Sequence, residues 1–167
     1  SQSSADESGT LVVVAELSAV SGKAVTVPFT LSGTATEGVD YSVSPSSISI
    51  PIGATTGSAT ISITTDAIDE SNETAILTIG TPTNATVGST NIHTATITDD
   101  DTFGVTVLES GSTTHVTEGS SATDTYTVVL NSEPTDAVTI TLTPDAQVSA
   151  DNTTLIFNSS NWNVVQT

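Results

Sequence analysis

The stretch SISIPIGATTGSATISI, residues 47–63, alternates apolar and small polar residues on both sides of a Pro- and Gly-containing turn. Ile48, Ile50 and Ile52 fall at every second position before the turn, and the pattern resumes at Ala59 after it. Successive side chains of a β-strand point to opposite faces, so this alternation predicts two strands that each bury one face.

The same alternation recurs along the first part of the chain, and no window of comparable length shows a helical period. The predicted strands lie near residues 10–17, 24–31, 46–52, 57–64, 73–79 and 92–98. Antiparallel strands joined by turn signals close naturally into a sandwich. We therefore predict an all-β fold.

Charge is very unevenly distributed between acids and bases. The chain has 19 acidic side chains against one basic side chain, Lys23, for a formal net charge of −18. This balance argues against nucleic acid and anionic membranes as partners, because nothing neutralises phosphates. It favours divalent cations, for which hard oxygen ligands are suited. A disordered acidic tail is the alternative, but the regular apolar alternation argues against it.

Strand direction brings the carboxylates of this first part together. If the strand near residues 10–17 starts at the end marked by Glu7, strand counting places eight carboxylates at that end. They are Glu7, Asp40, Asp66, Glu70, Glu73, Asp99, Asp100 and Asp101. The connections expected at the far end contain no acidic residue, whereas Lys23 lies in one of them.

Carboxylates gathered this closely repel one another unless a cation lies between them. Calcium takes 6–8 oxygen ligands, so the cluster is large enough for one ion or more. The sequence therefore predicts a Ca²⁺ site at this end of the sandwich. A solvated acidic end with loosely bound sodium is the alternative.

Four ordered motifs resemble the Calx-beta domain family. GTATEGVDY, residues 33–41, is similar to the family signature GTA-x-x-G-x-DY. Residues 47–63 resemble its hairpin, DAIDESNET (66–74) its acidic loop, and ATITDDD (95–101) its closing strand and acidic triplet. The resemblance implies an immunoglobulin-like sandwich over about residues 5–101.

By this resemblance, the eight carboxylates would be calcium ligands. One departure is Thr65-Asp66-Ala67, where the family often has consecutive aspartates. Family members also usually have a strand before the residue equivalent to Glu7, and Ser1 to Ala5 leaves little room for one. Tyr41 is expected to pack in the core, with a ligand-side role as the alternative.

A second set of strands follows almost at once, so we predict a first domain at residues 1–101 and a partial second sandwich at 102–167. Glu118 and Asp145 occupy the places that Glu7 and Asp40 hold in the first. The ending NSSNWNVVQT resembles a segment of bacterial Calx-beta-like repeats that precedes further strands. The second sandwich is therefore predicted to be incomplete, either as a piece of a longer repeat protein or because another chain completes it.

Nothing in the sequence predicts an enzyme. The chain lacks cysteine, which excludes disulfides, thiolate zinc sites and cysteine nucleophiles. His93 and His115 are the only histidines, and no G-x-S-x-G, P-loop or G-x-G-x-x-G motif is present. No apolar stretch approaches the roughly 20 residues of a membrane span, so membrane insertion is not expected.

These observations predict a calcium-binding structural and adhesive repeat module in which Ca²⁺ stiffens the junction at Asp99–Asp101. Its expected partners are calcium, neighbouring repeats or other copies of the chain, and a cell-surface or matrix partner. Composition resembles that of bacterial secreted repeat proteins, which implies an extracellular or cell-surface location. The alternatives are a subunit of a filament built by β-strand exchange and a calcium-sensing regulatory domain.

Overall fold

The computed structural model describes residues 1–167, which form two compact units. Unit 1 comprises Ser1–Asp66 and Ser71–Asp100, and unit 2 comprises Ala67–Glu70 and Asp101–Thr167. Apart from one short 3-10 turn at Ser110–Ser112 the regular structure is all strand, and no helix has the length and apolarity of a membrane span. The predicted all-β class is confirmed.

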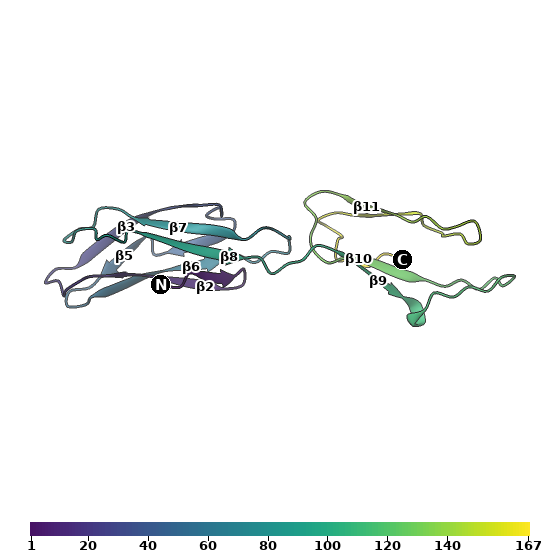
Figure 1. Cartoon of the computed structure of the whole chain (residues 1–167), viewed down its shortest axis with the longest axis horizontal. Coiled ribbons are helices and arrows are strands. Elements are labelled where there is room, and N and C mark those ends of the chain that lie inside the picture. The colour runs from purple at the N-terminus through teal and green to yellow at the C-terminus, as the bar shows by residue number, and fades with distance from the viewer. The chain divides into compact units, whose positions relative to one another are not determined.

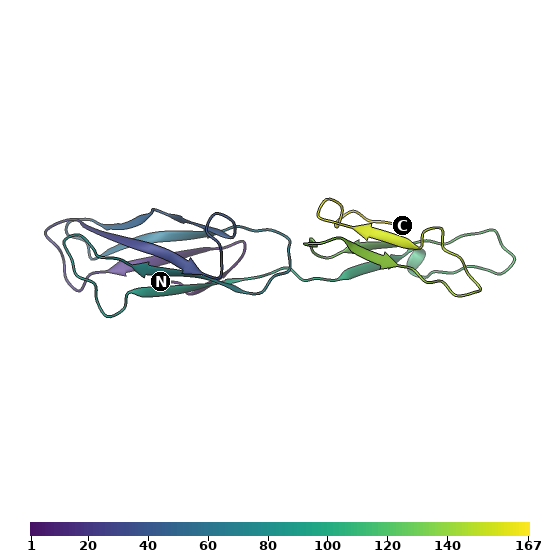
Figure 2. The ribbon, with the colours of Figure 1, turned by 90° about the horizontal axis from the view of Figure 1, so that it is seen from above.

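Unit 1 is a sandwich of two sheets (Figure 1). The five-stranded sheet has, in spatial order, β1 (Ser4–Asp6), β8 (Ile92–Thr98), β7 (Glu73–Ile79), β3 (Val25–Gly33) and β5 (Ser47–Ile50). The three-stranded sheet has β2 (Thr10–Glu16), β6 (Thr56–Ile63) and β4 (Tyr41–Ser44). The strands run lengthwise in the unit, so the connecting loops gather at its two ends (Figure 2).

The alternating residues form the core, as predicted from their period. Leu11, Val25 and Ile61 are completely buried, and each such side chain contributes about 1.5–3 kcal/mol to folding. Ile52 does not follow the prediction. β5 ends at Ile50, before Pro51, and the Ile52 side chain is 68% exposed.

The turn within residues 47–63 is not a hairpin, which corrects the interpretation drawn from the resemblance. β5 pairs with β3, whereas β6 pairs with β2 and β4, so the chain crosses from one sheet to the other. The two strands therefore face each other across the core. They come so close that a Cβ at Gly57 would lie 2.4 Å from the Ser49 carbonyl oxygen.

Two strands, β4 and β1, lie outside the predicted set, whereas β5 lies within the strand predicted near residues 46–52. β4 and β5 run in the same direction but belong to different sheets, and the chain changes sheet between Ser44 and Ser47. β1 lies where little room for a strand was expected, and it pairs with β8 in parallel. All other strand pairs of unit 1 are antiparallel, as predicted.

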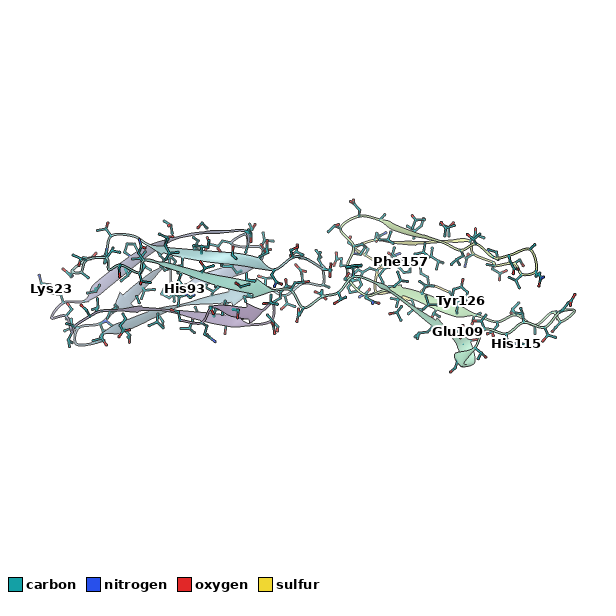
Figure 3. All side chains as sticks on the ribbon, viewed as in Figure 1. Lys23, His93, Glu109, His115, Tyr126 and Phe157 are labelled. Carbon is teal, nitrogen blue, oxygen red and sulfur yellow. The ribbon has the colours of Figure 1, made fainter.

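Unit 2 has two layers of two strands each. β9 (Val105–Glu109) pairs with β10 (Tyr126–Leu130), and β11 (Val138–Thr141) pairs with β12 (Thr154–Phe157). Phe157 is completely buried between the layers (Figure 3), and the half-buried Trp162 packs against the same cluster. Gln166 bridges to Val128 on the free side of β10.

Candidate metal centre

The acidic segments of unit 1 meet at one end of the sandwich. The Thr65 hydroxyl donates to the Glu7 carbonyl at 3.1 Å, and the Thr64 amide donates to the Asp40 carbonyl at 2.8 Å. The Asp99 amide donates to the Asn72 side chain at 3.3 Å, which adds the start of the Asp99–Asp101 triplet. Lys23 lies in the loop between β2 and β3, at the opposite end of the unit (Figure 3).

Three of the eight predicted ligands form a compact group. The carboxylates of Glu7, Asp100 and Asp101 each offer an oxygen atom within 4.8 Å of the others. Glu7 follows β1 directly, and its amide donates to the Thr98 carbonyl at the end of β8 at 3.2 Å. The parallel pairing of β1 and β8 therefore delivers both strand ends to the same place.

The donor set fits a hard divalent cation. All three groups supply carboxylate oxygens, and Glu7 is only 6% exposed. Next to them, Oδ1 of Asp99 is buried and accepts no hydrogen bond, which is a costly arrangement without a compensating partner. Calcium takes 6–8 oxygens, so carbonyls and water would complete the shell.

The remaining predicted ligands lie outside the group of three. Oδ2 of Asp40 accepts the Thr36 amide at 2.6 Å and so closes the loop before β4. Asp66 and Glu70 are exposed, and Glu73 is half-buried at the start of β7. These four residues and Asp99 remain predictions as ligands.

The family model described as Calx-beta domain matches residues 1–101. The chain belongs to the Calx-beta family. Calx-beta domains are calcium-binding regulatory domains, and the family is not one of enzymes.

Solved structures with the same fold include other Calx-beta domains. The apo form of the Calx CBD1 domain has a TM-score of 0.53 at 22% identity, covering 59% of this chain and 90% of that chain. The calcium-binding domain CBD12 of CALX1.1 has a TM-score of 0.54 at 22% identity, covering 59% of this chain and 42% of that chain.

CBD12 from CALX1.2 has a TM-score of 0.54 at 16% identity and covers 98% of this chain and 68% of that chain. The match to tandem domains extends through both units of the chain. A search of curated proteins found no match.

Two signature residues of the Calx-beta domain support the fold rather than the metal group. Tyr41 is 1% exposed in the core; its burial raises its pKa, and the charges of Glu37 and Asp40 raise it further. Gly33 has a φ of 127°, and a Cβ there would lie 2.0 Å from the Thr74 carbonyl oxygen. Only glycine fits that close approach of β3 to the start of β7.

The sequence interpretation overlooked two residues of the acidic stretch 66–74. Asn72 accepts the Asp99 amide and so orients the start of the triplet. Within unit 2, Oδ1 of Asp69 accepts the Phe103 amide at 3.2 Å. Asn and Asp side chains commonly accept amides at strand ends, and this tendency was the available signal.

Proposed function

We propose that the Calx-beta domain of this chain binds Ca²⁺ through Glu7, Asp100 and Asp101. The observation that carries the proposal is the convergence of these three carboxylates, one of them nearly buried, in a chain of net charge −18. The bound ion would offset the repulsion among these three carboxylates. Asp40, Asp66, Glu70, Glu73 and Asp99 are proposed as further ligands.

We further propose a structural role for the ion. Asp99–Asp101 follow β8 directly and lead into the next residues of the chain. An ion bound there fixes the backbone of a connecting segment and offsets repulsion among its acids. In this proposal the chain is a module of an extracellular or cell-surface protein, where calcium stiffens neighbouring repeats and supports contact with a cell-surface or matrix partner.

Thermal melting tests the metal proposal. In the full chain, excess Ca²⁺ should raise the melting temperature of unit 1 relative to chelator, because an ion that binds only the native state stabilises it, by about 2.7 kcal/mol at 100 times Kd. Asp101→Asn should reduce the increase. Glu16→Gln, which removes an exposed charge at the far end of β2, should not. An unchanged midpoint in EDTA would overturn the proposal.

Affinity separates this role from calcium sensing. Extracellular modules bind at about 10⁻⁴–10⁻³ M, whereas sensors bind at about 10⁻⁷–10⁻⁵ M. A dissociation constant in the lower range would therefore favour a regulatory domain over a structural module.

A second candidate function, assembly by β-strand addition, is favoured by unit 2. β9 pairs on one side only, with β10. Val105 and Val107 of β9 lie on the same face as their buried partners Leu130 and Val128, yet they are 48% and 54% exposed. A free strand edge beside uncovered apolar side chains is a surface to which another strand adds.

Light scattering across a range of protein concentrations tests strand addition. The proposal predicts association that increases with concentration and that Val107→Lys weakens. A strict monomer at all concentrations, with and without calcium, would contradict it.

A further inference from the structure

The first seven residues connect the two sheets of unit 1 along one open side. The Gln2 amide donates to the Val12 carbonyl, and the Val12 amide donates to the Gln2 side chain, both at 3.1 Å. These bonds attach the segment to β2. From Ser3 onward the segment belongs to the other sheet, because the Thr96 amide donates to the Ser3 carbonyl at 2.9 Å and β1 pairs with β8.

Few side chains of this segment are buried against the rest of unit 1. Ser1 to Ser4 and Asp6 are exposed, and Ala5 is the only apolar side chain of the segment that packs against the core. β1 has three residues and is an outer strand of its sheet. Ordering a short outer strand costs conformational entropy that a few hydrogen bonds only partly offset. Local opening is expected first at such a strand.

The far end of the segment is different, because it ends in the candidate metal centre. Glu7 is 6% exposed and shares the group of three carboxylates with Asp100 and Asp101, which follow β8. The parallel register pairs Asp6 with Thr98, so both strands reach the group at the same level. An ion that takes oxygens from both strand ends joins the segment to β8.

We propose that Ser1–Glu7 is a calcium-controlled strap. The inference rests on the proposed calcium site and extends it to regulation. With the ion bound, the strap lies on β8 and closes the side of the sandwich. Without the ion, repulsion among the three carboxylates favours release of Glu7, and the strap detaches. Because linkage is reciprocal, a change that frees the strap also weakens calcium binding.

Release would expose a defined part of unit 1. Ser1 borders a hollow of about 110 Å³ between the sheets, lined among others by Val13, Ile48 and Leu77. The edges of β2 and β8 lose their hydrogen-bond partners when the strap leaves. The calcium-free domain therefore presents strand edges and core side chains that the calcium-bound domain covers.

His93 acts as a positioning residue at the other end of the strap. Its Nε2 lies 2.9 Å from the Gln2 carbonyl oxygen, and the ring is half-buried on β8. This contact holds the strap on β8 at a point that is remote from the carboxylates. Loss of this contact is expected to weaken calcium binding without removing a ligand.

Hydrogen exchange by mass spectrometry on the full chain tests the strap. Calcium should slow exchange of amides 3–7 and 94–98 at least tenfold relative to EDTA, with little change in β4. Glu7→Gln should abolish the effect, whereas Asp6→Asn, on the same strap but outside the group, should preserve it. His93→Ala should weaken calcium binding several-fold, and His93→Gln, which retains a donor, should largely restore it.

Calorimetry on the same samples separates the two proposals. Calcium binding with unchanged exchange of amides 3–7 would overturn the strap and leave the metal site intact. Absence of calcium binding would overturn both. Binding in His93→Ala at the wild-type affinity would contradict the positioning role.

Discussion

Among single residues, Glu7 is the most important member of the candidate metal centre. It is the most deeply buried of the predicted ligands, and it faces two other carboxylates. A buried charge near like charges destabilises the native state unless an ion or donors compensate it. The like charges of Asp100 and Asp101 therefore make the native state less favourable without calcium than with it.

This opposition gives the first prediction. Glu7→Gln should raise the free energy of unfolding in chelator by about 1 kcal/mol, because it removes one charge from the cluster. In saturating calcium the variant should be less stable than the wild type, because it lacks a ligand. Chemical denaturation under both conditions measures the two changes, and equal effects in both would contradict the role of Glu7. Asp6→Asn is the control.

Asp124, in the loop between β9 and β10, is a carboxylate that hydrogen-bond donors stabilise. The Ser110 hydroxyl and the amides of His115 and Thr125 donate to its carboxylate and lower its pKa below the ordinary value of 3.8. A lowered folded-state pKa means that the contribution to loop stability is present above the free-residue pKa and is lost as pH falls through the folded-state value.

The second prediction follows from that sign. The protection of amides 110–125 against hydrogen exchange, corrected for the intrinsic exchange rate, should be constant above about pH 5. This protection should decrease as pH falls below about 4. Asp124→Asn should show weak protection at all pH values. NMR-detected exchange measures it, and a pH-independent protection in the wild type would contradict it.

At the scale of elements, the long alternating strands were predictable because their period alone fixes a buried face. β2, β3, β6, β7 and β8 all lie where the period placed them. The partners of these strands could not be predicted, because alternation identifies the buried face of a strand but not its neighbour. The crossing between β5 and β6 was therefore interpreted as a hairpin. β1 escaped prediction because Ser4–Asp6 holds a single apolar residue.

Two isoleucines of residues 47–63 test where the buried strand positions begin and end. Ile61→Ala should destabilise unit 1 by about 2–5 kcal/mol, because the side chain is completely buried and its removal leaves a cavity. Ile52→Ala should change stability by less than about 0.5 kcal/mol, because the side chain is 68% exposed. Denaturant unfolding measures both, and similar losses would contradict the assigned strand end.

At the scale of the whole molecule, the net charge of −18 makes cations the natural partner. Strand direction was enough to predict which acidic segments share one end, and hydrogen bonds between those segments support it. It was not enough to predict which carboxylates converge, because that depends on side-chain positions and on the parallel placement of β1 beside β8. Asn72 was missed for the same reason.

Calcium titration calorimetry of the chelator-treated full chain tests the central claim most directly. We expect saturable binding at about 10⁻⁴–10⁻³ M that Asp100→Asn with Asp101→Asn weakens at least tenfold and Glu16→Gln leaves unchanged. Absence of saturable heat up to about ten times that concentration range, or undiminished affinity in the double variant, would contradict a calcium site at Glu7, Asp100 and Asp101.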